Sequence, residues 1–364
     1  MKAAGELIAG GYFLMEHRAW KSVIFDYPRS VPTMLAQEEK RYLFWLGQHA
    51  WSGAGTVVEI GPWLGGSTVC LAAGMRASGH AARGKLHAID NFLWREFMAA
   101  RAPLPLTSGD SFEPFFLRNM VGYTDIVVSH ARALPDEAIE GDADAGATRF
   151  SGEKAVALFD GLPGADPVEI LFIDGAKSWR GMRHLLLTIS NRLLPGKTLL
   201  VCQDFKYWGA YWVPMMMARL DARIEPVQNV RHGTTVAFRL KSAIPRGELE
   251  RFQDHVARVP TEDGLRLLDR AAGWLRDDGD ALGAAHVSLS GVRFLVHQGH
   301  VDRATEEFLR VQSSWPSRAD VSQVALARQY LATRTGRALP RPLRMRLAAQ
   351  WQKARGAWRK HASR

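Results

Sequence analysis

The chain of 364 residues lacks several features that would place it in a special class of protein. It has only two cysteines, Cys70 and Cys202, which excludes a disulfide framework and favours a reducing compartment, so we expect a cytoplasmic protein. It has no run of about 18 apolar residues, the length needed to span a bilayer. Residues 1–15 lack the apolar core and the cleavage site of a signal peptide, and we expect none.

The body of the chain also lacks an excess of positive charge, although the formal net charge is +10. Ten of the 47 Lys and Arg residues lie between Arg334 and Arg364, a stretch without Asp or Glu. Residues 1–333 therefore hold 37 basic and 37 acidic side chains. This balance argues against nucleic acid as a partner, because tracking a phosphate backbone needs a basic surface.

What the chain does contain is an alternation of short apolar runs and longer helical patterns. Apolar strands separated by helices are typical of a parallel sheet covered on both faces. The short connection at residues 229–233 favours an antiparallel hairpin at one edge. The expected fold class is α/β, a Rossmann-like, doubly wound, mostly parallel seven-stranded sheet with a reversed edge strand. The strands are expected at residues 56–60, 85–89, 125–129, 168–173, 198–202, 223–227 and 234–240.

Beyond residue 243 the sequence shows helical spacing only, which predicts a C-terminal all-α domain. We expect an N-terminal lid or cap segment at residues 1–40, the Rossmann-like domain at 41–243, a helical domain, partly tetratricopeptide-like, at 244–335, and a basic amphipathic helix at 336–364. Within the helical domain, helices are expected at residues 248–259, 261–276, 281–298, 301–315 and 321–333.

The basic C-terminal segment has an apolar stripe at helical spacing, and its members are Leu343, Leu347, Trp351, Ala354 and Trp358. A basic amphipathic helix of this kind can make peripheral contact with an anionic membrane or capture an acidic partner. Alternatively, the stripe packs against the helical domain and the charges are solvated.

Four acidic residues lie at the carboxyl ends of the predicted parallel strands: Glu59, Asp90, Asp174 and Asp204. The carboxyl ends of parallel strands lie at one edge of a sheet, and ligands bind beyond that edge. The sequence therefore predicts a shared acidic rim.

The loop after the first strand is rich in glycine and carries Gly61, Trp63, Gly65, Gly66 and Ser67. A dinucleotide-binding fingerprint spaces its glycines as G-x-G-x-x-G, but here the first two are four residues apart and Trp63 occupies the place of the middle glycine. The carboxylate of Glu59 before the loop would repel a phosphate and attract an amine or a sulfonium. These departures argue against NAD and for a small cofactor that carries a positive charge.

The motifs Glu59-Ile60-Gly61…Gly65-Gly66-Ser67-Thr68, Ala88-Ile89-Asp90, Leu171-Phe172-Ile173-Asp174-Gly175 and Leu194-Pro195-Gly196…Gln203-Asp204 follow one another in the chain. In this order and spacing, the sequence resembles the class I S-adenosylmethionine-dependent methyltransferases. Within them it looks most like the branch of catechol-type and macrocin-type sugar O-methyltransferases. The resemblance covers about residues 55–240 and implies S-adenosylmethionine as the cofactor.

The resemblance also implies roles for the rim residues. Glu59 and the loop from Gly61 to Ser67 would hold the methionine portion of the cofactor, with Asp174 nearby, and Asp90 would accept hydrogen bonds from the ribose hydroxyls. A carboxylate is well suited to accept two hydrogen bonds from a vicinal diol. His130 and Ala131 would contact the adenine, although the acid that family members often carry there is absent. The alternatives are a capping or ion-pair role for Glu59 and a solvated turn at Asp90.

Catechol-type relatives bind a divalent cation at the positions of Asp174 and Asp204, so the resemblance implies a Mg²⁺ site. Two hard oxygen ligands and water suit that ion. The family pattern continues with Asn after the second acid, whereas this chain has Phe205. Without a metal, the two carboxylates need a proton, a cation or an amine nearby.

Lys177 follows Asp174 by three residues, the spacing at which catechol-type enzymes place a base. A lysine acts as a base only if burial or a nearby cation lowers its pKa toward neutrality. The alternative is an exposed lysine at the start of the next helix.

These observations predict a methyltransferase that methylates a hydroxyl of a small molecule or sugar, with Lys177 and Asp174 at the reaction centre. The alternative is a catalytically silent, cofactor-binding scaffold whose helical domain recruits proteins. Association into a homo-oligomer is left open by the sequence.

Overall fold

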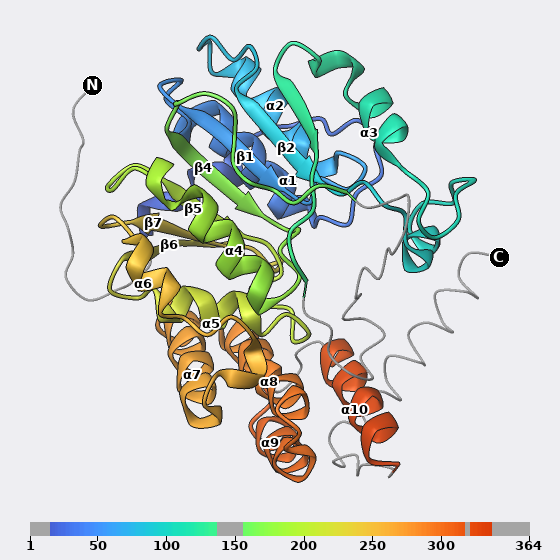
Figure 1. Cartoon of the computed structure of the whole chain (residues 1–364), viewed down its shortest axis with the longest axis vertical. Coiled ribbons are helices and arrows are strands. Elements are labelled where there is room, and N and C mark those ends of the chain that lie inside the picture. The colour runs from blue at the N-terminus through green and yellow to red at the C-terminus, as the bar shows by residue number, and fades with distance from the viewer. Residues whose placement is uncertain (1–14, 137–155, 317–320, 337–364) are drawn as a thin grey trace.

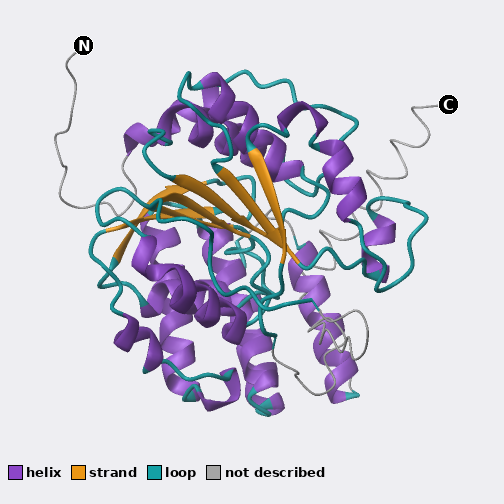
Figure 2. Cartoon of the chain, turned by 45° about the horizontal axis from the view of Figure 1, so that its top comes forward, coloured by secondary structure: helices purple, strands orange, loops and turns teal. Residues whose placement is uncertain are grey.

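The computed structural model describes residues 15–136, 156–316 and 321–336, coloured by position along the chain in Figure 1. In this part of the chain, seven strands form one sheet with helices on both faces (Figure 2). The strands are β1 (Thr56–Ile60), β2 (Leu86–Asp90), β3 (Val127–Ala131), β4 (Val168–Ile173), β5 (Leu199–Cys202), β6 (Ile224–Asn229) and β7 (Val236–Leu240).

The helices fall into a group that covers the sheet and a C-terminal group below it (Figure 1). The α-helices are α1 (Gln37–Trp45), α2 (Gly66–Ala77), α3 (Glu113–Asn119), α4 (Trp179–Ile189), α5 (Trp212–Arg219), α6 (Arg246–Glu250), α7 (Thr261–Asp277), α8 (Ala281–His297), α9 (Val301–Ser313) and α10 (Ser322–Thr335). Short helical turns of other types are Met15–Ser22, Leu46–Ala50, Glu96–Ala100, Val121–Tyr123, Ser190–Arg192 and Val256–Arg258. No helix of the described residues is long and apolar enough to cross a membrane.

The order of strands in the sheet is β3-β2-β1-β4-β5-β7-β6. Strands β1 to β5 pair in parallel, and β7 runs antiparallel to both β5 and β6. This confirms the predicted mostly parallel sheet with an antiparallel edge, where the reversed strand is β7 and the outermost strand is β6. Strand β3 begins two residues later than expected, because the amide of Ile126 donates to the carbonyl of Tyr123 and closes a turn before the strand.

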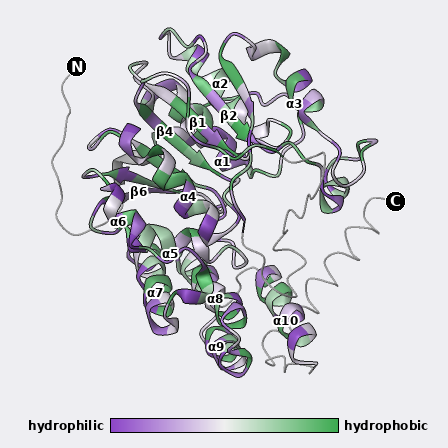
Figure 3. Ribbon diagram, viewed as in Figure 1, coloured by the Kyte–Doolittle hydropathy of each residue, from purple (hydrophilic) through white to green (hydrophobic). Residues whose placement is uncertain are grey.

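Apolar side chains of the central strands alternate between two cores. Val57 and Phe172 belong to a cluster with α1, α2 and α3, whereas Val58 and Leu171 belong to a cluster with α4 and α5. Figure 3 shows this difference in burial: β1 and β4 are hydrophobic along most of their length, whereas α7 and α9 have both hydrophobic and hydrophilic residues. Burial on both faces explains the near-continuous apolar runs that predicted a parallel sheet.

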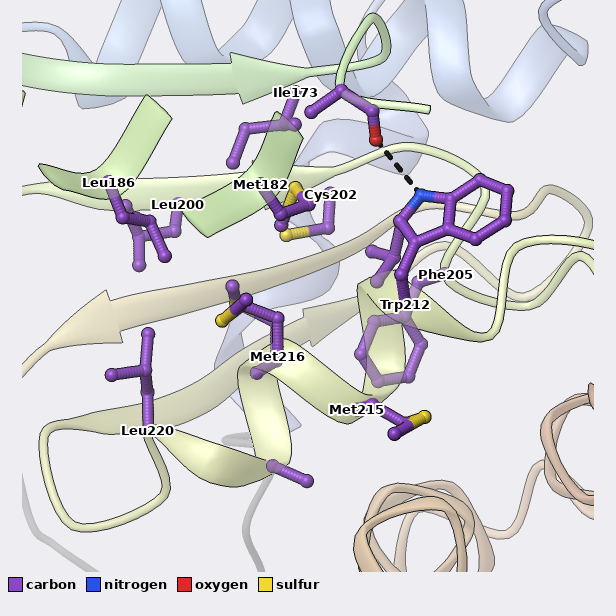
Figure 4. Close-up of a cluster of buried hydrophobic side chains, with 14 of the residues drawn as sticks. Ile173, Met182, Leu186, Leu200, Cys202, Phe205, Trp212, Met215, Met216 and Leu220 are labelled. Atoms are coloured by element: carbon purple, nitrogen blue, oxygen red, sulfur yellow. Dashed lines mark hydrogen bonds between the residues drawn. The ribbon is translucent and has the colours of Figure 1, made fainter. Parts of the chain in front are cut away.

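The second core continues from the sheet into the C-terminal helices. Figure 4 shows its part around α5, where Phe205 and Trp212 lie beside methionine side chains. The ring of Trp274 in α7 lies 5.3 Å from that of Phe238 in β7. A buried polar link lies nearby, where Nζ of Lys206 donates to Oδ2 of Asp280 at 3.1 Å. The sheet therefore packs against α7 through apolar contacts, while the charged contact links the loop after β5 to the residue before α8.

The prediction of one helix over residues 248–259 is wrong. Helix α6 ends at Glu250, and a separate helical turn follows at Val256–Arg258. The ring of His255 accepts a hydrogen bond from the amide of Ala257 at 3.0 Å, with His255 itself in an extended conformation. The predicted basic helix at 336–364 lies outside the described residues, apart from Gly336.

Candidate functional site

A cavity of about 740 Å³ lies beyond the carboxyl ends of β1, β2, β4 and β5. This volume is in the range that holds a cofactor or a small molecule. The predicted site residues that line the cavity are Gly61, Trp63, Gly66, Ser67, Asp90, Asp174, Lys177 and Asp204. The predicted site residues that do not line it are Glu59, Gly65, His130 and Ala131.

The glycines of the loop between β1 and α2 allow close approach of other parts of the protein. Gly61 has a φ of 83°, and a Cβ placed on it would lie 2.5 Å from the backbone of Gly175. A Cβ on Gly66 would lie 2.7 Å from Thr33. The loop thus packs against the end of β4 on one side and against the segment before α1 on the other. Thr33 also lines the cavity, within the predicted lid or cap segment.

Glu59 lies beneath the glycine loop and is fully buried. Its Oε1 accepts a hydrogen bond from the hydroxyl of Ser67, while its Oε2 is a buried oxygen without a hydrogen-bond partner in the described part of the chain. Burial raises the pKa of Glu59 to about 7, and the hydroxyls of Ser67 and Thr68 oppose this shift. Glu59 therefore acts on the cavity through Ser67, and it has an unused acceptor.

Asp90 ends β2 with its side chain at the cavity. One carboxylate oxygen accepts from the amide of Phe92 at 2.8 Å. Burial raises the pKa of Asp90 to about 6, against the opposing effects of the Phe92 amide and the Arg95 guanidinium. At neutral pH the group is thus mostly ionised and can accept hydrogen bonds from a ligand.

The raised pKa of Glu59 predicts a pH dependence of stability. Between its ordinary value of 4.5 and about 7, the folded protein keeps a proton that the unfolded chain releases. The contribution of Glu59 to the free energy of unfolding therefore falls as pH rises through this window, by a few kcal/mol in total, about 1.4 kcal/mol per unit of pKa shift. Urea unfolding of the wild type and of Glu59→Gln at several pH values checks this. The stability difference between the two proteins is expected to change with pH, and a constant difference would contradict the buried, protonated carboxyl.

His130 and Ala131 lie in β3, away from the cavity lining. A ring nitrogen of His130 lies 2.9 Å from a ring nitrogen of His87 in β2, and burial lowers the pKa of both histidines. The two rings therefore form a neutral hydrogen-bonded pair. The cavity is lined instead by the residues that follow, from 132 to 136.

Asp174, Lys177 and Asp204 form one ionic cluster on the cavity wall. Nζ of Lys177 lies 2.7 Å from Oδ1 of Asp174 and 2.9 Å from Oδ2 of Asp204. The two carboxylates raise the pKa of Lys177 well above its ordinary value, which outweighs the effect of burial. The ammonium form is thus favoured, and the lowered pKa that a lysine base requires is not present here.

Neighbouring residues fix the backbone that carries the ionic cluster. The indole of Trp212 donates to the carbonyl of Ala176 at 2.9 Å, which fixes the loop between Asp174 and Lys177 (Figure 4). Asp204 has a φ of 60°, and Trp63 and Phe92 also have positive φ at the same edge of the sheet. Such conformations in residues other than glycine are costly and gather at functional sites.

The residues at this position do not fit a divalent cation. The ammonium of Lys177 already lies between the two predicted ligands, Asp174 and Asp204. Phe205, where the family pattern has Asn, is fully buried and packs against Phe238. In the described residues, no group of three or more His, Cys, Asp or Glu side chains is arranged to hold a metal.

Several cavity residues were not predicted from the sequence. Arg95, Phe97, Met98 and Arg101 line the cavity from the turn after β2, and Phe97 is 62% exposed. This turn lies in a stretch of loop without helical or strand periodicity, so pattern analysis does not mark it. The one available signal was its position, soon after the strand that ends in Asp90.

Residues 58–205 match the family model described as a methyltransferase domain. Among solved structures, the chain is similar to the O-methyltransferase NovP, with 16% identity and a TM-score of 0.34 over 56% of this chain and 78% of that one. It is also similar to the Bacillus cereus O-methyltransferase in complex with S-adenosylhomocysteine, with 15% identity and a TM-score of 0.33 over 59% of this chain and 84% of that one. Similarities of this size do not establish a shared function. No curated protein sequence matches the chain.

Proposed function

We propose that the protein, whose residues 58–205 match a methyltransferase domain, is an S-adenosylmethionine-dependent methyltransferase. The observation that carries the proposal is the position of Asp90, an ionisable carboxyl at the end of β2 that faces a cavity of about 740 Å³. Beneath the same cavity, the buried carboxyl of Glu59 accepts from the hydroxyl of Ser67, which lines the cavity. Both features suit a positively charged nucleoside better than a phosphate.

In this proposal, Asp90 accepts hydrogen bonds from the ribose hydroxyls. Glu59 and Ser67 hold the methionine portion at the N-terminal end of α2, where free backbone amides favour its carboxylate. The adenine lies beside Ile89 and Leu134, which line the cavity. His130 is not needed for this pose.

The cofactor would supply a methyl group on a sulfonium. In the transfer, the sulfur–carbon bond breaks as the oxygen–carbon bond forms, the bonding electron pair stays on sulfur, and the proton of the acceptor hydroxyl passes to solvent. Such an in-line displacement depends mainly on alignment. The walls of the cavity hold the acceptor in line with the sulfonium.

We place the acceptor at the open end of the cavity, between Met34, Phe97 and Met98. Met34 is 54% exposed and Phe97 62% exposed, an unusual exposure for apolar side chains that line a cavity. Apolar and aromatic surfaces of this kind hold the ring of a small molecule or the apolar face of a sugar. The proposed reaction is therefore O-methylation of a hydroxyl on such an acceptor.

Titration calorimetry with S-adenosylhomocysteine tests the cofactor site, and transfer of a labelled methyl group to a panel of phenols and sugars tests the activity. Binding together with transfer to a hydroxyl supports the proposal. Binding without transfer to any acceptor supports the silent scaffold instead. Failure of the folded protein to bind the nucleoside overturns both.

A further inference from the structure

We propose that the ammonium of Lys177 is the resident cation of this site and takes the position in which a divalent cation would bridge Asp174 and Asp204. The remaining N–H donor of Lys177 then holds the acceptor oxygen. The first statement concerns only this chain's residues, whereas the second rests on the proposed methyltransferase function.

The geometry around Nζ supports a bridging cation. The two carboxylate oxygens at 2.7 and 2.9 Å come from loops after neighbouring parallel strands, β4 and β5. Two carboxylates that face one position repel each other unless a positive charge lies between them. Lys177 supplies that charge from within the chain, so the pair is compensated without an added ion.

Both anions are positioned by the protein itself, Asp174 through its amide, which donates to the carbonyl of Ile60 at 2.8 Å. Asp204 adopts its left-handed conformation while its amide donates to the hydroxyl of Thr234 at 3.3 Å. The next residue, Phe205, points into the core, where its ring lies 5.4 Å from that of Phe238. Position 205 therefore supplies no oxygen ligand, because its side chain is an apolar ring that packs in the core. The site offers a cation two carboxylate ligands, so an ion that takes six would have to complete its coordination with water.

Within the described part of the chain, Lys177 also has one N–H donor without a partner. An ammonium carries three N–H groups, and the carboxylates of Asp174 and Asp204 accept two of them. The Lys177 side chain is 45% exposed and lines the cavity, so the third N–H can reach a ligand there. The cluster as a whole keeps one net negative charge, which complements a sulfonium in the proposed reaction.

The proposal predicts that the wild-type protein needs no divalent cation. Titration with Mn²⁺, followed by electron paramagnetic resonance of the free ion, is expected to show no site at concentrations up to about 1 mM, in the range of weak carboxylate sites. Removal of metals with EDTA is expected to leave the thermal unfolding temperature unchanged. A wild-type Mn²⁺ site that disappears in Asp204→Asn would overturn the proposal.

The Lys177→Met variant tests the same point from the opposite side. Without the ammonium, the two carboxylates are expected to bind Mn²⁺ at least about tenfold more tightly than the wild type does, because their repulsion is relieved by the ion. Lys177→Arg keeps the positive charge and is the matched control, expected to show no gain. Loss of the gain in a Lys177→Met, Asp204→Asn double variant assigns the ion to this position.

The absence of Mn²⁺ binding in a folded Lys177→Met protein would overturn the claim that the ammonium fills a cation position. If that variant does not fold, the wild-type titration and the arginine control still decide the question. None of these measurements depends on S-adenosylhomocysteine. A failed nucleoside titration therefore counts against the proposed function alone, and a wild-type Mn²⁺ site counts against the role of Lys177 alone.

Discussion

Replacement of Asp90 by alanine is expected to weaken the binding of S-adenosylhomocysteine at least about a hundredfold. Two hydrogen bonds from a vicinal diol to an ionised carboxylate contribute about 1.5–3 kcal/mol each, and their joint loss corresponds to such a change. Since burial raises the pKa of Asp90 to about 6, the measurement belongs at pH 7.5, where the carboxylate is ionised. Titration calorimetry gives the two affinities directly.

Two further variants separate recognition from folding. Asp90→Asn keeps one oxygen that can accept from the amide of Phe92, but it replaces the charged second oxygen by an NH2 donor, so its loss of affinity is expected to be intermediate. Asp166→Ala removes an exposed acid before β4, at the opposite edge of the sheet, and is expected to leave the affinity unchanged. A folded Asp90→Ala protein with wild-type affinity would remove the ribose role of this residue.

The sheet and the acidic rim could be predicted because both depend on local sequence. Strands β1 and β4 have the predicted bounds. The end of β4 brings Asp174 to the same cavity as Asp90, the last residue of β2, and Asp204, which follows β5. Parallel strands place their carboxyl ends at one edge whatever the details of packing. The acidic residues at this edge can therefore be identified from the predicted strand ends alone.

The direction of single side chains was harder to predict. Glu59 is two residues after Val57 in β1, so both side chains point to the face of the sheet that α2 covers. The carboxyl of Glu59 therefore lies beneath the glycine loop and not in the cavity. His130 is opposite Ile89 in the sheet register and turns with it towards the α4 side, where His87 is its partner. The period of two along a strand holds this information, whereas a motif match does not use it.

The ionic cluster depends on contacts that no local pattern contains. The spacing of three residues between Asp174 and Lys177 is compatible with a salt bridge, but the approach of Asp204 depends on strand pairing and on a left-handed residue after β5. The cavity wall around Phe97 likewise lies in a short helical turn, Glu96–Ala100, between loops. Periodicity carries no signal in such segments, so tertiary structure alone reveals their part in the site.

The largest loss of stability is expected for Phe205→Asn, the change that would restore the family's Asn. Phe205 is fully buried, and its ring lies 5.4 Å from Phe238 in the sheet and 6.5 Å from Trp274 in α7. Removal of a buried phenyl ring costs about 3–5 kcal/mol. The amide that replaces it would be buried without hydrogen-bond partners, which adds to the cost. Urea unfolding at constant pH measures the difference from the wild type.

Phe97→Asn is the matched control for this prediction, because it makes the same substitution at a phenylalanine that is 62% exposed. Its effect on the free energy of unfolding is expected to stay within about 0.5 kcal/mol. If Phe205→Asn were as stable as the wild type, the side chain at 205 would not be committed to the core between the sheet and α7. It would then be free to turn towards Asp204, and the packing argument against a further metal ligand would fail with it.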